Sequence, residues 1–221
     1  MQARLTDLNR NEILLYLGHR GQEITPQIRE QMERCVQQVC KKAQPRLVYR
    51  RLGAEQGQVK GFPMEGNDIR ALLGECQEAV LMAVTLGAGV EQLLMRSEVT
   101  NMADAVIMDS CASVAVENVC DNFEADLRAL LAGQGLYLTS RFSPGYGDLP
   151  LSLQPKFCEV LNTAKRIGLT VSANYLLVPR KSVTAVMGIS EKPQQLRVRG
   201  CEVCSMFLDC PYRIRGKQCR E

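Results

Sequence analysis

Apolar residues recur at helical spacing in three long stretches of the chain. From Thr25 to Pro45 they fall at every third or fourth position, and threonine followed by proline is a typical start of a helix. The stretch 100–132 is apolar nearly all round in its first half, which predicts a long central helix covered on several sides. A third helix is expected to begin at Ser152, as its N-cap, and to end at Gly168.

Strand patterns lie between these helices. Residues 79–86 are apolar on both faces, which is typical of a strand buried inside a sheet. Residues 47–66 contain four glycines and predict short strands and turns, after which Asn67 or Asp68 caps a short helix that ends at Leu73. Further strands are expected at 137–142, 175–179 and 182–189.

Helices and strands follow one another without the regular βαβ rhythm of a parallel sheet, so the expected fold class is α+β. We expect a twisted, mostly antiparallel sheet with a long central helix, flanking helices and a small cysteine-rich C-terminal tail. The chain then divides into an N-terminal helical and short-strand part, a core and a tail, at 1–66, 67–192 and 193–221.

Composition narrows the class of protein. The 221 residues are 46% hydrophobic and carry a formal net charge of +3, which suits an ordinary core and gives no reason to expect a nucleic-acid partner. The longest strictly apolar run, 79–84, is far shorter than the roughly 20 residues of a membrane helix, and the N-terminus lacks an apolar signal segment. We therefore expect a cytoplasmic protein with reduced thiols and no membrane partner.

Ten cysteines and a single histidine, His19, direct attention to thiolate chemistry. Four cysteines near the C-terminus have the spacing C-x2-C-x5-C-x8-C, and four convergent thiolates can hold a [4Fe–4S] cluster or a zinc ion. Unmetallated thiols on a solvated basic tail remain the alternative. The candidate ligands are Cys201, Cys204, Cys210 and Cys219, and the six other cysteines are expected to behave as small buried hydrophobes.

The segment from Arg141 to Pro150, Arg-Phe-Ser-Pro-Gly-Tyr-Gly-Asp-Leu-Pro, is the most informative part of the sequence. Two glycines and two prolines impose an unusual backbone path. Arg141 offers a planar fork suited to a carboxylate or phosphate, and Tyr146 can lay its ring against a flat heterocycle. A rigid surface turn with one solvated arginine has the same composition, so both interpretations stay open on these residues alone.

This decapeptide resembles the S-adenosylmethionine-binding segment in the activation domain of cobalamin-dependent methionine synthase, where an arginine is followed three residues later by Pro-Gly-Tyr. The segment 175–185 is similar to that family's "Pro … Ser-Val-Ser" stretch, and the helix 102–121 resembles the one that bears an Ala-Glu pair. The likeness covers roughly residues 70–190 and is strongest to free-standing short members. One difference lies near the N-terminus, where the family's long form holds the ligand's amino group with an acidic residue and residues 15–21 contain none.

The resemblance implies a function: reductive reactivation of a corrinoid methionine synthase in trans, an activity of the methyltransferase class. Arg141 would bind the methionyl carboxylate of S-adenosylmethionine, and Pro144, Gly145 and Tyr146 would hold its adenosyl part. Tyr146 is also the candidate catalytic residue. Glu117 would sit at the back of the pocket, although a helix glutamate more often belongs to a solvated face.

The resemblance also implies partners. His19 lacks the Asp-x-His-x-x-Gly context of a cobalamin ligand, so the cobalamin would arrive on a corrinoid protein or on a core methionine synthase without its own activation domain. A flavodoxin or ferredoxin-type donor would supply the electron. Two other functions stay open: a non-catalytic module that binds S-adenosylmethionine or a corrinoid protein, and an Fe–S electron carrier with a vestigial pocket.

Overall fold

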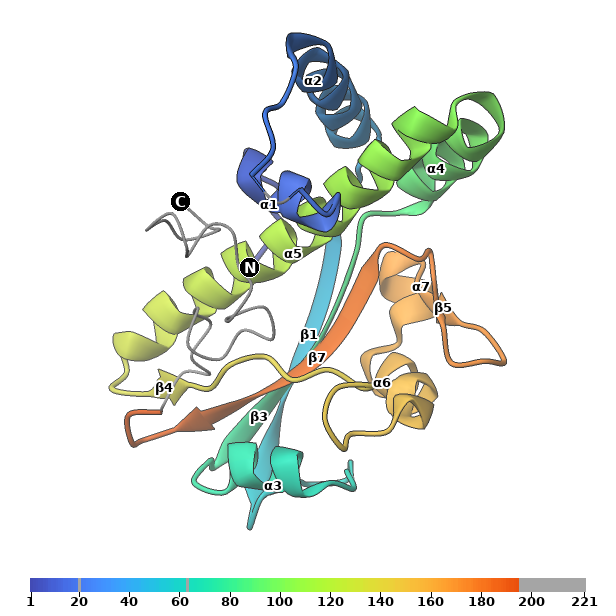
Figure 1. The fold of residues 1–221 in the computed structure, drawn as a ribbon. Coiled ribbons are helices and arrows are strands. Elements are labelled where there is room, and N and C mark those ends of the chain that lie inside the picture. The colour runs from blue at the N-terminus through green and yellow to red at the C-terminus, as the bar shows by residue number, and fades with distance from the viewer. Residues whose placement is uncertain (20, 63, 195–221) are drawn as a thin grey trace.

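A five-stranded antiparallel sheet lies at the centre of this computed structural model, which describes residues 1–19, 21–62 and 64–194 (Figure 1). The strand order is β2-β1-β3-β7-β4, and a separate two-stranded sheet is formed by β5 and β6. The expected α+β class and antiparallel sheet are therefore confirmed. The bounds are β1 Arg46–Glu55, β2 Gln58–Val59, β3 Glu78–Thr85, β4 Tyr137–Leu138, β5 Thr170–Val171, β6 Leu177–Val178 and β7 Ser182–Ser190.

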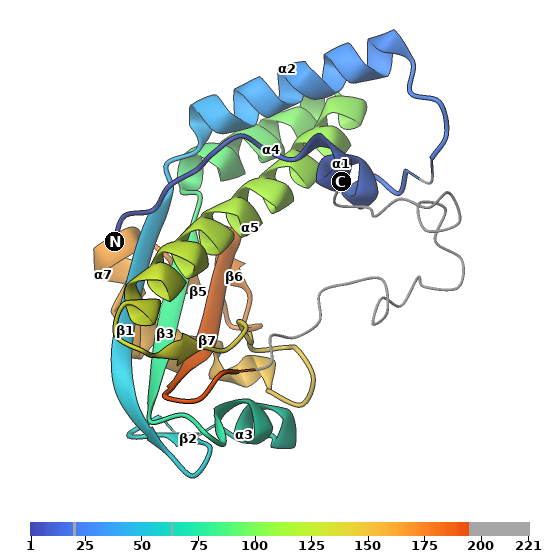
Figure 2. The same ribbon diagram turned by 90° about the vertical axis from the view of Figure 1, so that its left-hand side faces the viewer.

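The central strand β3 is apolar on both faces because each face packs in a different hydrophobic core. Val80, Met82 and Val84 belong to one hydrophobic core, which they share with the long helix α5. Their neighbours Leu81 and Ala83 point to the opposite side and belong to a second core, with α6. Because helices cover both faces of the sheet (Figure 2), neither side of β3 meets water.

The first helical layer is built on α5 (Figure 1). Asn101 caps α5 by accepting hydrogen bonds from two backbone amides of its first turn, and Thr25 caps α2 as the sequence predicts. The helix α4, which starts after Gly87 and ends where α5 begins, has no counterpart among the predicted helices. The helices of this layer are α1 Arg10–Tyr16, α2 Pro26–Lys42, α4 Ala88–Thr100 and α5 Met102–Ala132.

In the second helical layer, on the other face of the sheet, one predicted helix differs from the structure at its start and in its continuity. Ser152 is not an N-cap: it lies in a 3-10 turn, Leu151–Leu153, and the helix predicted to run on to Gly168 is broken at Asn162, whose φ of 51° is left-handed. Gly168 does end the second piece, as expected. The layer consists of α3 Asn67–Leu73, α6 Gln154–Leu161 and α7 Thr163–Ile167.

Two predicted strands are shorter than expected. Beyond Leu138 the chain leaves the regular ladder, and Phe142 makes an isolated bridge with Val186 of β7. In the segment 175–179 the pairing is confined to β6, because Tyr175 adopts a left-handed φ of 62°. Because β4 ends at Leu138, Arg141 is not part of a regular strand, and its side chain need not follow the alternation of a strand.

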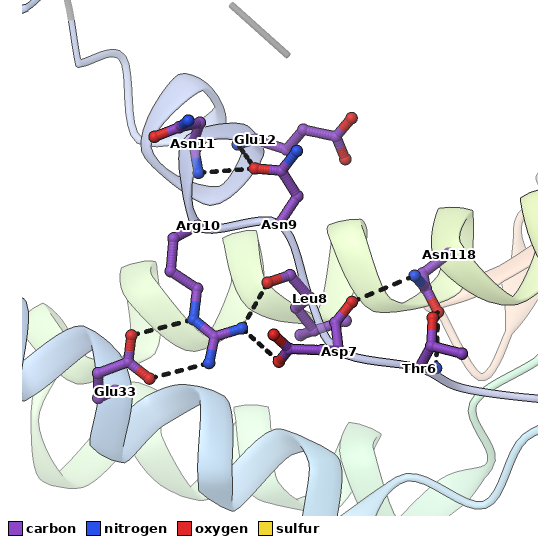
Figure 3. A network of polar contacts seen from close by, with 9 residues as sticks. All are labelled: Thr6, Asp7, Leu8, Asn9, Arg10, Asn11, Glu12, Glu33 and Asn118. Atoms are coloured by element: carbon purple, nitrogen blue, oxygen red, sulfur yellow. Dashed lines mark hydrogen bonds and ion pairs between the residues drawn. The ribbon is translucent and has the colours of Figure 1, made fainter. Parts of the chain in front are cut away.

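The N-terminal segment is tied to this layer by polar contacts (Figure 3). Arg10 makes two hydrogen bonds of 3.0 Å to the carboxylate of Glu33 on α2 and also donates to Asp7. The Thr6 amide and hydroxyl both donate to Asn118 on α5. These contacts hold the start of α1 against α2, and the segment before α1 against α5.

The described cysteines are free thiols, of which Cys40 and Cys158 are half-buried and the other four are buried. In the described ranges, no three His, Cys, Asp or Glu side chains are grouped to hold a metal ion. The predicted ligands Cys201, Cys204, Cys210 and Cys219 lie outside those ranges. Within the same ranges, none of the helices combines the length and the apolar character that crossing a membrane requires.

Candidate functional site

A pocket of about 240 Å³ lies between α5, the segment that follows β4, and the start of β7. It is slightly smaller than typical ligand pockets of roughly 300–1,000 Å³. Three of the predicted site residues, Glu117, Arg141 and Tyr146, line it together, and Pro144 and Gly145 lie in the loop between lining residues. The other lining residues are Ser140, Phe142, Ser143 and Val183.

Arg141 reaches the pocket because the chain around it is fastened to β7 at two points only. The Thr139 amide donates to the Gly188 carbonyl, and Phe142 exchanges two hydrogen bonds of 2.9 Å with Val186. The irregular stretch between these points turns the Arg141 side chain toward α5, much as a β-bulge redirects a side chain. The side chain is only 5% exposed, so its charge needs partners inside the protein.

Three carboxylates of α5 surround the Arg141 guanidinium. Nη2 donates to Asp121 Oδ1 at 2.6 Å and to Glu117 Oε2 at 3.0 Å. Nη1 faces Glu124 Oε2 at 3.4 Å, an ion pair without hydrogen-bond geometry. Asp121 and Glu124 are not among the predicted site residues, although their spacing from Glu117, four and seven residues, places all three on one helix face.

This charge cluster keeps Arg141 protonated. Burial by itself would lower its pKa, but the neighbouring groups raise it by more, and the pKa lies above the ordinary value of an arginine. The groups that raise it are Cys120, Asp121, Glu117 and Glu124. A buried, permanently charged guanidinium is suited to bind an anionic group.

Glu124 connects this cluster to a second arginine. Arg128 donates to Glu124 Oε1 at 2.8 Å and to the carbonyl of Thr139 at 2.9 Å, and it also contacts the carbonyl of Leu138. Arg128 thereby fixes the chain just before Arg141 to the end of α5. The position of Arg141 relative to α5 thus depends on side chains as well as on the sheet.

The start of β7, which brings Val183 to the pocket, is also held by ion pairs. Lys181 pairs with Asp109 of α5 at 2.8 Å, and the Arg180 side chain pairs with Glu91 and Glu98 of α4. These contacts join the pocket wall to α4 and α5.

The loop 143–150 folds back on itself and presents Tyr146 at the mouth of the pocket. The Gly145 amide donates to the Leu149 carbonyl at 2.8 Å, and the Tyr146 amide donates to the Ser143 carbonyl at 3.1 Å. Gly145 has a φ of 92°, a backbone conformation that favours glycine. The Tyr146 residue is 64% exposed, so its ring is available to a ligand at the surface.

Asp148 anchors this loop to α3, which was not anticipated. Asn67 and Asp68 were predicted to cap α3, but the N-cap is Gly66, and the carboxylate of Asp148 accepts from the Asn67 and Asp68 amides instead. Gly147 has a φ of 53°, a backbone conformation that favours glycine, and a Cβ there would lie 2.3 Å from an Asp68 carboxylate oxygen, which would have to move. A capping carboxylate supplied by another segment leaves no local sequence signal.

His19 lies in the turn that follows α1, which ends at Tyr16. The Gly21 amide donates to its Nδ1 at 3.3 Å, and its Nε2 lies 2.7 Å from the Gln22 carbonyl oxygen. Both ring nitrogens therefore contact the backbone of the same turn.

Comparison with known proteins agrees with this architecture. No known family profile matches the sequence, and no curated protein sequence matches it. Among solved structures, the MetH reactivation domain bound to AdoHcy aligns with 96% of this chain and with 82% of its own chain, with a TM-score of 0.59 and 13% sequence identity. At this identity the likeness is one of fold, and at that level the resemblance stated from the sequence is confirmed. The chain has the fold of the MetH reactivation domain.

Proposed function

We propose that this protein reactivates a corrinoid-dependent methionine synthase in trans by positioning S-adenosylmethionine for methyl transfer to cobalt. The observation that carries the proposal is the meeting of Arg141, Glu117 and Tyr146 in one pocket. The fold of the MetH reactivation domain, whose solved structure has AdoHcy (S-adenosylhomocysteine) bound, supports it. A cytoplasmic location agrees with this role.

The pocket residues fit such a ligand in charge and shape. The Arg141 guanidinium can bind the α-carboxylate through charge-assisted hydrogen bonds once one of the α5 carboxylates leaves it. The exposed ring of Tyr146 suits the flat adenine or the ribose. Pro144 and Gly145 would hold the adenosyl part with their backbone, and Glu117 would close the inner wall.

The chemistry belongs largely to the reactants. An electron from a flavodoxin or ferredoxin-type donor reduces Co(II) to Co(I) on the partner, the sulfonium S–CH₃ bond breaks as the Co–CH₃ bond forms, and S-adenosylhomocysteine is left. This chain's residues need only orient the ligand and shield it from water, which is the usual contribution of a protein to cofactor chemistry. Tyr146, at the mouth of the pocket, is the candidate to contact the reacting end.

We further propose that the C-terminal cysteines Cys201, Cys204, Cys210 and Cys219 would hold a [4Fe–4S] cluster, or else zinc, and a cluster held there would supply one-electron redox chemistry. We also propose that the chain divides into an N-terminal part, a core and this cysteine-rich tail, at 1–66, 67–192 and 193–221. Anaerobic purification with absorbance and iron analysis tests it: about four iron atoms per chain support a cluster, and one zinc without iron excludes an electron-carrying role.

The decisive experiment combines the full chain with a Co(II) corrinoid protein, a reductant and methyl-labelled S-adenosylmethionine. We expect label in methylcobalamin, and a loss of at least about ten-fold in Arg141→Ala, because a charge-assisted contact to the carboxylate is removed. Arg34→Ala, which removes an exposed arginine of α2 paired with Glu30, serves as the control and should retain full transfer.

Tyr146→Ala provides a second test that does not depend on a buried residue. Its exposed side chain can be removed without disturbing the core, so a reduced rate in a fully folded variant would locate the effect in the site. Binding of S-adenosylmethionine without labelled methylcobalamin would favour the non-catalytic binding module. No binding by the wild-type chain would exclude the proposed function.

A further inference from the structure

The Arg141 hydrogen bonds restrict what kind of ligand can enter the pocket. Nη2 has two N–H groups, and both are donated to protein carboxylates, one to Asp121 and one to Glu117. Nη1 is buried against Glu124. A ligand carboxylate that binds Arg141 through Nη2 therefore has to take the place of Asp121 or Glu117.

Such a displacement has an electrostatic cost. The displaced protein carboxylate stays next to the incoming ligand carboxylate, and like charges at this distance repel. A ligand that also carries a positive group beside its carboxylate removes the repulsion, because the positive group can pair with the displaced side chain. An α-amino acid end has this arrangement, since its ammonium and carboxylate are attached to the same carbon.

Asp121 is the better candidate for the displaced partner. Its short side chain has two rotatable bonds, so a carboxylate that leaves Arg141 stays close to the entering ligand, whereas the longer Glu117 can swing away. Its side chain is 53% exposed, which gives it room to move. We propose that Asp121 binds the α-ammonium of the ligand when Arg141 binds the α-carboxylate, so that the Arg141–Asp121 pair is exchanged for the ligand's zwitterion.

This proposal rests on the proposed function, because it assumes that the pocket takes an adenosyl ligand with an amino-acid end. It names Asp121 as a residue that determines specificity. A ligand that keeps the carboxylate but lacks the ammonium should bind poorly, since its carboxylate and Asp121 then face each other without a cation between them.

The test compares two ligands on the full chain by calorimetry: S-adenosylhomocysteine and its deaminated analogue, in which hydrogen replaces the ammonium. The wild-type chain should bind the deaminated analogue at least about ten-fold more weakly, because an ammonium contact is lost and a repulsion is gained. In Asp121→Asn we expect a crossover: S-adenosylhomocysteine binds about five-fold more weakly and the deaminated analogue binds more tightly.

Two further variants sharpen the result. Asp126→Asn removes an equal charge from the same helix, at a residue that pairs with Arg4, and should change neither affinity by more than about two-fold. Asp121→Glu retains the charge and should restore most of the preference for the ammonium. Equal weakening of both ligands in Asp121→Asn, or no change in either, would overturn the inference alone. Failure of the wild-type chain to bind S-adenosylhomocysteine would overturn the proposed function as well.

Discussion

At the scale of single residues, burial sets the chemistry of the thiols. It raises the pKa of Cys35 and of Cys76 to about 11, and that of Cys111 to about 12, because the interior disfavours a thiolate. Asp104, which lies near the Cys35 sulfur, adds to the shift. These residues act as small apolar groups in the core: Cys35 and Cys111 lie in helices, and Cys76 lies in the connection between α3 and β3.

We expect Cys76 to be alkylated slowly in the folded chain. A pKa of about 11 against an ordinary value near 9 reduces the thiolate fraction about 100-fold at pH 8, and burial slows the reagent further. Iodoacetamide treatment followed by peptide mapping, with a urea-unfolded sample as reference, measures the rates. Equal rates in the two samples would contradict the burial of this thiol.

The same shift makes a prediction about stability at alkaline pH. Because the pKa is higher in the folded state, the contribution of Cys35 and Cys76 to stability is fully present below about pH 9 and is lost as pH rises toward 11. Urea unfolding should therefore show a fall in the free energy of unfolding over this window. Cys76→Ala should have a shallower fall; an identical slope would show that this thiol does not contribute.

At the scale of elements, the loop that carries Tyr146 and the helix α3 stabilise each other through Asp148. The loop lies about eighty residues after the helix in the sequence, yet its carboxylate accepts from the first amides of α3. Glycine at position 66 provides no capping side chain and leaves room for Asp148. The loop is thus held at both ends, by the Phe142–Val186 bridge and by this cap.

Removal of this cap should destabilise the protein. Asp148→Ala is expected to cost about 1 kcal/mol of unfolding free energy, the usual value of a lost N-cap, and to weaken ligand binding through the looser loop. Asp148→Asn keeps an acceptor and should cost less. Ser152→Ala is the matched control: a cap at Ser152 would also cost about 1 kcal/mol, but the structure shows none and the change should be near neutral. Urea unfolding of the three variants distinguishes these outcomes.

At the scale of the whole molecule, the N-terminal segment joins the two long helices of the first layer. Arg10 binds Glu33 on α2 through two hydrogen bonds, and Thr6 binds Asn118 on α5 (Figure 3). The hydrogen bond with Glu33 is the largest reason that the pKa of Arg10 is raised above its ordinary value. Thr6, before α1, and Arg10, the first residue of α1, thus act together as a clasp across the layer.

A double-mutant cycle on Arg10 and Glu33 tests this clasp. We expect a coupling energy of about 1 kcal/mol, since the pair is bidentate but partly exposed to solvent. The exposed pair of Arg34 and Glu30 on α2 is the reference and should give about 0.3 kcal/mol. Equal coupling in the two cycles would show that the clasp adds nothing beyond an ordinary surface pair.

The helices and strands that could be predicted are those in which the order of apolar and polar residues shows which faces are buried. The helix α2 has its cap and apolar stripe in consecutive residues, and β3 is apolar on both faces because both faces are covered. The helix α4 was missed because Gly87 and Gly89 at its start indicate a turn more strongly than a helix. The prediction of Ser152 as an N-cap is wrong, because the sequence does not show that the chain forms a 3-10 turn there.

The sequence by itself determined the fold class, the long central helix and the turn of the segment from Arg141 to Pro150, because periodicity and turn residues act over a few neighbouring positions. Only the tertiary structure decided that Arg141 meets Asp121 and Glu124, and that Asp148 reaches α3. Contacts between residues far apart in the chain depend on how whole elements pack, and no local pattern encodes that packing. The proposal that Asp121 binds the ammonium of the ligand therefore depends on the contact between Arg141 and α5, which only the tertiary structure shows.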